Sequence, residues 1–470
     1  MHVLRWALIA VALTGLLFSG PVQGALLGDF TIQDEVELGR EVNQFVRSHF
    51  DLLNDPVVAE YVRSVTERIE SHLPPQPFPI SVTVVNDESL NAFAAPAGYM
   101  FVHTGLLLHL ESEAQLAGVI AHELAHVTQR HIARNIERSQ LINLGTLAGM
   151  LAGVFLGGGG EGSEALAMGS LAGGQAAALK YSREDEREAD QIGVHYLQNA
   201  GYPVQGMVEA FEVIRKRKWF SGHSLPTYLS THPGVGERIA ALQGRVEGES
   251  SGSSSLQSGT SRFERIQMLV RARYTDPSSA LVAFNDTQSE QDTCMLALGR
   301  AIALERLQRV EEAGQAYERA LDCAPDDPLV QREAGHFMYL QGKLDRARRL
   351  LKAALDQRHT DTRAMFWYAQ TLAQAGDPEH SIRIGEEVVR REPRNARAHA
   401  FLGRLQGQRG KLFEAHLHLA YAALYGHGAS QLPFHIQKTK EMAHSEKQRQ
   451  RLSSLQEAVA ESKKLEKLTP

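Results

Sequence analysis

The sequence predicts a mostly α-helical protein whose N-terminal half contains a small β-sheet and whose C-terminal half is a solenoid of helical repeats. Three features predict this fold class: an apolar helical segment at residues 119–131, a 34-residue period of small residues, and a Ser/Gly-rich stretch between the halves. A chain of 470 residues is too long for one compact core, so two or three domains are expected. The net charge of −6 argues against a nucleic-acid-binding protein.

The N-terminal end has the pattern of a secretory signal peptide over residues 1–24. Arg5 precedes an apolar run of 13 residues, and residues 22–24 suit cleavage before Ala25. The run is shorter than the roughly 20 residues that span a bilayer, which disfavours the alternative of an uncleaved anchor. We therefore expect export into an oxidising compartment.

The next segments predict the elements of an N-terminal domain over residues 25–245. A helical pattern covers residues 34–73 and ends in the Pro-rich break LPPQPFP. The alternating, β-branched run ISVTVVN at residues 80–86 predicts a strand, and AGYMFVHTG at residues 97–105 predicts a second strand that enters a turn. Helical patterns dominate the remainder of this domain.

The stretch VIAHELAHVTQRH carries the residues that point to chemistry. His122 and His126 are four residues apart, so a helix projects both imidazoles from one face. Polar groups on an apolar face cost free energy unless something satisfies them, and two neutral imidazoles supply two corners of a tetrahedral zinc site. Glu123 beside them can hold a water molecule and accept its proton as the water attacks a peptide carbonyl. The alternative is a chance His-Glu-x-x-His pattern in a structural helix.

A catalytic zinc site needs a third protein ligand. His131 lies nine residues beyond the first of these histidines, half a turn away from the metal-binding face, and is expected in a supporting or surface position. In YSREDEREADQIG, Glu186 and Asp190 share one helix face, so the glutamate suits zinc and the aspartate suits the N–H of a ligating histidine. Glu184 and Glu188 share a second face, and spacing alone does not choose between the two pairs.

HELAH together with SREDEREAD resembles the zinc metallopeptidase family that includes HtpX and the CAAX prenyl endopeptidase. The segment NAFAAPAGYMFVHTGLL at residues 91–107 is similar to the family's segment that borders the cleft before the zinc helix. The resemblance implies a gluzincin-type metalloprotease domain that binds one Zn2+ per chain through His122, His126 and Glu186. It also implies that Asp190 is the partner of a ligating histidine, beside Glu123 as general base.

The stretch YLSTHPGVGERIAAL at residues 228–242 supplies a further candidate. Resemblance suggests that His232 reaches the zinc, either as a fourth ligand that closes the site or as a donor to the tetrahedral oxyanion. A turn position without a catalytic role is the alternative for His232. Arg238 either serves the same oxyanion or braces the loop. An extended substrate is expected to pair with the main chain of Asn91–Tyr99 along the cleft edge.

The C-terminal half follows the stretch VEGESSGSSSLQSGTS at residues 246–261, which predicts a flexible linker. Within residues 262–470, small residues recur with a period of 34 at Ala301, Gly335, Ala369 and Gly403. The period resembles the tetratricopeptide repeat, a pair of antiparallel helices with small residues where the helices cross. Residues 262–290 suit a degenerate leading repeat, and residues 432–468 suit a solubilising cap. Stacked repeats form a concave groove that binds a peptide or a partner protein.

A glycine stripe and a cysteine pair complete the pattern. The glycines at positions 145, 149, 153 and 157 fall on one helix stripe, and we expect a hairpin inside the protease while peripheral membrane contact stays open. Cys294 and Cys323 occupy the first and thirtieth positions of one repeat, where its antiparallel helices begin and end. An oxidising compartment favours a disulfide between them, and a buried free pair is the alternative.

These expectations combine into a periplasmic zinc metalloendopeptidase with a C-terminal repeat domain. The resemblance implies misfolded or stalled outer-membrane β-barrel proteins as substrates, whose assembly the protein assists, and the outer-membrane barrel-assembly machinery as the partner in the repeat groove. One alternative is a repeat scaffold or chaperone of that assembly with a latent protease, although every zinc-site residue type is present. The other is a membrane-embedded protease like HtpX, which the short apolar runs disfavour.

Overall fold

The computed structural model describes residues 30–139, 180–220, 227–246, 257–285, 293–426 and 428–466. The expected signal peptide, the glycine stripe and most of the expected linker lie outside these ranges. The elements of the N-terminal part are α2 (Ile32–His49), α3 (Pro56–Glu70), β1 (Ser81–Val85), β2 (Ala92–Ala94), η1 (Pro96–Gly98), β3 (Tyr99–His103), α4 (Thr104–His109), α5 (Glu113–Thr128), α6 (His131–Ser139), α10 (Arg183–Asn199), α11 (Gln205–Phe220), α12 (Thr227–Thr231) and α13 (Val235–Val246).

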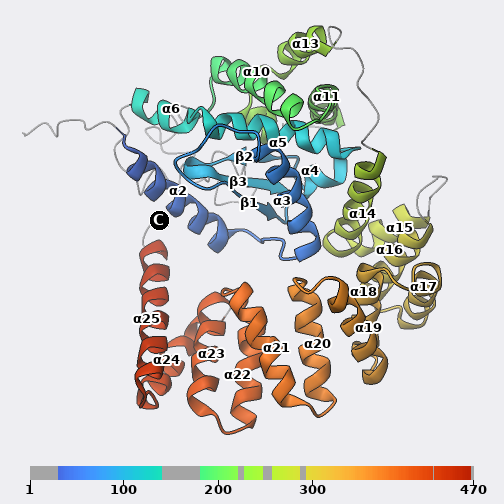
Figure 1. Ribbon diagram of the computed structural model, residues 1–470, viewed down its shortest axis with the longest axis vertical. Helices are drawn as coiled ribbons and strands as arrows, with labels where there is room; N and C mark the ends of the chain where they lie inside the picture. The colour runs from blue at the N-terminus through green and yellow to red at the C-terminus, as the bar shows by residue number, and fades with distance from the viewer. Residues whose placement is uncertain are drawn as a thin grey trace, which may run out of the picture.

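The helical pattern at residues 34–73 forms two helices because the chain turns between them. Asp55 begins α3 by accepting a hydrogen bond from the main-chain N–H of Val57 at 3.0 Å, and Pro56 occupies the first helical turn, where its missing N–H is tolerated. Helix α2 packs against η1 and shares a buried apolar cluster with the sheet. Helix α3 packs against α5, and the two helices α2 and α3 lie at different ends of the sheet in Figure 1.

A three-stranded sheet has the order β1-β3-β2, in which β1 and β3 are parallel and β2 and β3 are antiparallel. The two expected strands are present as β1 and β3. The short edge strand β2 was not predicted, because Ala-Phe-Ala has no β-branched residue and only three residues pair. Its Phe93 pairs with Phe101, and the two rings stack with centroids 4.9 Å apart. This edge strand lies beside α5.

The helix α5 runs through the core of the N-terminal part, with nearly every residue buried. Helices α3, α10 and α11 surround it (Figure 1). Two glycines permit this close packing: a Cβ on Gly118 would lie 2.5 Å from the Cα of Met207, and one on Gly193 would lie 3.2 Å from the carbonyl oxygen of Ala121. The polar residues of α5 therefore face other elements and not solvent.

The C-terminal part is an array of antiparallel helix pairs that forms an arc below the N-terminal part in Figure 1. Its elements are α14 (Gln257–Tyr274), α15 (Pro277–Asn285), α16 (Thr293–Arg306), α17 (Val310–Cys323), α18 (Pro328–Leu340), α19 (Leu344–Gln357), α20 (Thr362–Gln374), α21 (Pro378–Arg391), α22 (Ala396–Gln408), α23 (Leu412–Tyr425), η2 (Ala429–Gln431), α24 (Leu432–Glu441) and α25 (Glu446–Glu466).

The small residues of the 34-residue period lie where paired helices cross. A Cβ on Gly335 would lie 2.8 Å from Leu351, and one on Gly403 would lie 2.7 Å from Leu419, each on the partner helix. The predicted disulfide is confirmed: Cys294 and Cys323 are bonded, with Cα atoms 5.5 Å apart. It joins the start of α16 to the end of α17.

The two halves share one continuous hydrophobic core, which the linker pattern did not predict. Helix α14 begins at Gln257, inside the stretch expected to be linker, and packs against α3, α4 and α5 as well as α16. Phe263 and Leu269 on α14 are fully buried in a cluster that also contains residues of α3 and α18. Burial of these apolar residues stabilises α14, and the helix therefore includes the polar residues that precede Phe263. Among the described residues, no helix is long and apolar enough to span a membrane.

Candidate metal centre

The candidate site lies where α5 meets α10. Helix α5 begins at an N-cap serine whose hydroxyl accepts the N–H of Gln115, and α10 begins at Ser182 with a capping box. His122 and Glu123 on α5 and Glu186 on α10 are fully buried. Burial of this many polar groups is tolerated only when each is satisfied, which makes the site a candidate for a bound ion.

The donor atoms converge as ligands of one ion would. The Nε2 atoms of His122 and His126 lie 3.0 Å apart, and the Glu186 carboxylate oxygens lie 3.6 Å from the first and 3.5 Å from the second. Ligands about 2.0–2.1 Å from a tetrahedral zinc ion are separated by about 3.4 Å. His232 adds its Nδ1 atom, 3.4 Å from His122 Nε2 and 2.9 Å from the Glu186 Oε1. The four residues therefore fit a divalent transition metal.

The outer nitrogen of each α5 imidazole has a partner that fixes its tautomer. His122 Nδ1 lies 3.0 Å from Asp190 Oδ1 and donates to it, which leaves Nε2 with its lone pair toward the centre. His126 Nδ1 lies 2.6 Å from Nδ1 of His131, whose Nε2 in turn lies 3.2 Å from a Glu188 oxygen. His131 is fully buried and thus supports the centre from outside, one of the two positions expected for it.

Packing decides which of the two acidic pairs on α10 faces the histidines, a choice that residue spacing left open. Glu186 and Asp190 face α5, whereas Glu184 is exposed to solvent. Glu188 accepts a hydrogen bond from Arg134 at 2.7 Å in addition to its contact with the histidine relay. Glu188 therefore belongs to the surroundings of the centre.

Electrostatics in the centre favour a cation. Burial opposes ionisation of Glu186, yet Arg238 and His232 hold its pKa well below the usual range. Burial and Arg238 disfavour the imidazolium of His122, yet Asp190 and Glu186 outweigh them and raise its pKa. Burial holds the pKa of His126 well below its usual value, so this ring stays neutral, as a metal ligand must be.

Glu123 is placed beside the donor atoms and not among them. Its Oε2 accepts the main-chain N–H of Ala94 on β2 at 3.0 Å. Its Oε1 lies 3.6 Å from Nε2 of His232, and within the described ranges neither of these two atoms has a hydrogen-bond partner. Burial raises the pKa of Glu123 to about 8. A cation held by the neighbouring donors would favour the carboxylate again.

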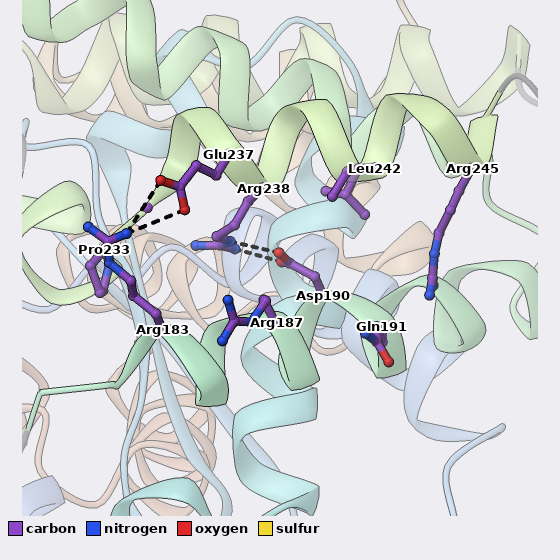
Figure 2. Close-up of a pocket in the computed structure, with 11 residues that line it drawn as sticks. Arg183, Arg187, Asp190, Gln191, Pro233, Glu237, Arg238, Leu242 and Arg245 are labelled. Atoms are coloured by element: carbon purple, nitrogen blue, oxygen red, sulfur yellow. Dashed lines mark hydrogen bonds and ion pairs between the residues drawn. The ribbon is translucent and has the colours of Figure 1, made fainter.

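Arg238 braces the centre from α13. Its Nε and Nη2 atoms donate to the two Asp190 oxygens at 2.7 and 2.6 Å, and its Nη1 donates to Glu186. Figure 2 shows this side chain reaching from α13 to Asp190 on α10, beside a pocket whose rim carries the Arg183–Glu237 pair. Arg238 is 4% exposed and its donors face the carboxylates of Glu186 and Asp190 on α10, so it braces the centre and not only the loop that was expected.

Tyr181 and Tyr228 also line the centre, although neither belongs to a spacing pattern that predicts metal ligands. The Tyr181 ring stacks on His126 with centroids 3.7 Å apart, and the Tyr228 ring stacks on His232 at 4.1 Å. Tyr181 precedes the N-cap of α10 by one residue, a position next to the acidic motif that could have drawn attention. Tyr228 precedes His232 by four residues, the spacing of one helix face.

Comparison with known proteins identifies the domain that contains this centre. Residues 53–246 match the profile of peptidase family M48. The chain carries an M48 peptidase domain. All residues of the centre lie inside that range, and M48 peptidases depend on a metal ion. The chain is therefore a metalloprotease. Residues 295–328 and 338–405 match tetratricopeptide repeat profiles.

Curated relatives combine the same two parts. The chain is 28% identical to the "Beta-barrel assembly-enhancing protease" of Escherichia coli (strain K12) over 388 residues, which cover 77% of this chain and 75% of the relative. It is also 28% identical to the "Putative beta-barrel assembly-enhancing protease" of Vibrio cholerae, covering 66% and 63%. Outside bacteria, the "Mitochondrial metalloendopeptidase OMA1" of Arabidopsis thaliana is 35% identical over 171 residues, 34% of this chain and 30% of that relative.

Proposed function

We propose that this chain is a zinc metalloendopeptidase of the periplasm that degrades misfolded or stalled outer-membrane proteins and assists their assembly. The observation that carries the proteolytic part is the buried convergence of two imidazoles and one carboxylate at the separations of tetrahedral ligands, with a second carboxylate beside them. The substrate class is supported by the printed name of the bacterial relatives. Export is supported by the signal-like pattern at residues 1–24.

In this proposal one zinc ion is held by His122, His126 and Glu186. Imidazole and carboxylate ligands at these separations suit zinc in a catalytic site with three protein ligands. When bound, zinc supplies Lewis-acid chemistry, polarising a peptide carbonyl and making water more acidic. Asp190 keeps His122 in the ligating tautomer, and Arg238 keeps Asp190 in place.

The protein's own groups then perform the proton transfers. Glu123 accepts the proton of the attacking water and delivers it to the leaving amine, while the N–H of Ala94 keeps one carboxylate oxygen in position. His232 contributes a fourth donor atom, and with zinc bound it would occupy the position that a catalytic site otherwise leaves for water. Substrate turnover therefore requires His232 to leave this position.

Residues 25–245 would form the protease and residues 262–470 the repeat domain, whose groove would bind the outer-membrane barrel-assembly machinery. Tetratricopeptide repeats commonly present concave protein-binding surfaces, which supports a protein partner for this half.

The decisive experiment uses residues 25–470 with zinc measured per chain and reduced, carboxymethylated α-lactalbumin as unfolded substrate. We expect one zinc per chain in the wild type and in Glu123→Gln, with turnover lowered about 10²–10⁴-fold in the variant. Glu186→Gln is expected to lose zinc. The matched control is Glu184→Gln on the exposed face of α10, which should keep both zinc and turnover.

Two results would contradict the proposal. Absence of zinc from the wild type, or full turnover by Glu123→Gln, would remove the assigned site and leave a binding role for the repeats. For His232→Ala we expect zinc to be retained and turnover to rise. Unchanged turnover would remove His232 from the gating role.

A further inference from the structure

The edge strand β2 presents main-chain groups to the proposed cleft in a regular alternation. Asn91 accepts from the N–H of His103 at 3.0 Å, and the N–H of Ala95 donates to Tyr99 at 2.7 Å, so the odd-numbered residues bond to β3. In an antiparallel pair, the residues that alternate with these bonded residues direct their N–H and C=O groups away from the partner strand. Ala94 is such a residue, and its outward groups are those that an added strand would use.

Both outward groups of Ala94 are already occupied in this structure. Its N–H donates to Glu123 at 3.0 Å, and its carbonyl oxygen accepts from the Tyr181 hydroxyl at 3.3 Å. The first contact orients the proposed general base. The second has no part in the chemistry described above, yet it lies on the same residue.

Tyr181 is held in this position by its ring. The side chain is 3% exposed, and the ring stacks on His126 with an interplanar angle of 21°. A tyrosine phenol ordinarily titrates at about pH 10 and is therefore protonated at neutral pH. The hydroxyl is therefore a hydrogen-bond donor, as the amide N–H of a peptide is.

We propose that the Tyr181 hydroxyl stands in for the main-chain N–H of an extended peptide substrate, and that substrate binding displaces it from the Ala94 carbonyl. This inference rests on the proposed function, because it assumes that the peptide enters beside Glu123. In this role Tyr181 competes with the substrate for the Ala94 carbonyl oxygen. Its hydroxyl keeps that oxygen hydrogen-bonded until a peptide binds, and the competition lowers substrate affinity.

The geometry makes the exchange favourable. An O–H···O hydrogen bond is commonly 2.7–2.8 Å long, so the 3.3 Å contact of Tyr181 is a weak one. An amide N–H from a pairing strand can approach the same carbonyl at about 2.9 Å with strand geometry. A buried carbonyl must also keep a partner, which explains why a removable donor occupies it in the free protein.

Peptide binding to the Glu123→Gln protein tests the inference without turnover. The probe is a fluorescein-labelled 12-residue peptide that spans a cleavage site mapped in carboxymethylated α-lactalbumin, followed by fluorescence anisotropy. Adding Tyr181→Phe keeps the ring on His126 and removes the hydroxyl, so we expect roughly three- to tenfold tighter binding. In the Glu123-containing protein, the same substitution should lower KM by a similar factor with kcat unchanged and zinc retained.

Two controls separate this effect from a general loss of packing around the centre. Tyr196→Phe removes the hydroxyl of a buried tyrosine on α10, which lies 2.9 Å from the Thr128 hydroxyl, and should leave peptide affinity unchanged. A series of peptides with a single N-methylated amide should contain one member that gains nothing from Tyr181→Phe, because its blocked amide is the one that replaces the hydroxyl.

The outcomes distinguish this inference from the proposed function. If the wild type cleaves the substrate but Tyr181→Phe leaves affinity unchanged or weakens it, the displacement is wrong and the protease assignment stands. A fall in kcat with unchanged peptide affinity would assign Tyr181 to the reaction itself and overturn the stand-in role. If the wild type has no zinc and no turnover, the proposed function fails first.

Discussion

Arg332 on α18 joins the repeat domain to the protease through a buried ion network, and its removal should destabilise the protein. Its guanidinium donates to both oxygens of Asp55 at 3.1 and 2.9 Å and to Asp361 at 3.1 Å. It also donates to Glu333 at 2.9 and 2.7 Å. Asp55 caps α3, which packs on α5, so the network reaches the helix that carries the metal-binding histidines.

The expected cost follows from burial. Arg332, Asp55 and Glu333 are fully buried, and Asp361 is 4% exposed. In Arg332→Met, Asp361 loses this guanidinium, while Asp55 retains Arg363 at 3.3 Å. Removing one partner of a buried ion pair costs about 3–5 kcal/mol because the other charge stays buried. We expect the free energy of unfolding to fall by that amount.

The assay is equilibrium unfolding in urea, followed by tryptophan fluorescence in a Trp219→Phe background, in which Trp367 on α20 is the one tryptophan of residues 25–470. This indole lies in the contact region, with the guanidinium of Arg363 5.0 Å from its ring. The matched control is Arg346→Met, which removes an arginine paired with Glu318 at 2.6 Å. That pair is 38% and 43% exposed, so its loss should cost only about 0–1 kcal/mol.

A double variant tests the cause of the effect. Asp55→Asn keeps an N-cap acceptor for α3 but removes the charge, so it should cost less in the Arg332→Met background than in the wild type. If Arg332→Met destabilised the protein no more than Arg346→Met, the network would contribute little. The contact between the halves would then depend on the apolar core around α14.

Two further predictions concern the repeat domain. Burial opposes the ionisation of Glu305 and Glu333, but Arg273 outweighs it and holds the pKa of each at about 2, below the ordinary 4.5. Their stabilisation is thus complete above about pH 4.5 and is lost as the pH falls toward 2, and Arg273→Met should move the acid-unfolding midpoint, measured by circular dichroism, to higher pH. An unchanged midpoint would refute this. Replacing both Cys294 and Cys323 by serine should lower the free energy of unfolding, measured in urea, by about 3–4 kcal/mol, because the disulfide joins residues separated by 29 positions in the sequence. A variant as stable as the wild type would show that the disulfide is dispensable.

Local periodicity was sufficient for the elements and for part of the centre. The four-residue spacing of His122 and His126 places both rings on one face of any α-helix, so these two could be predicted without knowledge of the fold. The 34-residue period predicted the helix pairs, and the positions of Cys294 and Cys323 within one pair predicted their bond. By contrast, the edge strand β2 has no local signal because three residues contain too little pattern.

The tertiary structure alone decided which segments far apart in the chain come into contact. Glu186 and Glu188 sit two positions apart on α10, and only the packing of α10 on α5 turns one of them to the imidazoles and the other to Arg134. The same packing brings Tyr181 to the centre, and the contacts of α12 and α13 with α10 and α11 bring His232 there. The spacing of residues along one helix follows from its geometry, whereas the choice of which faces meet depends on the burial of the whole core, to which residues from both halves of the chain contribute.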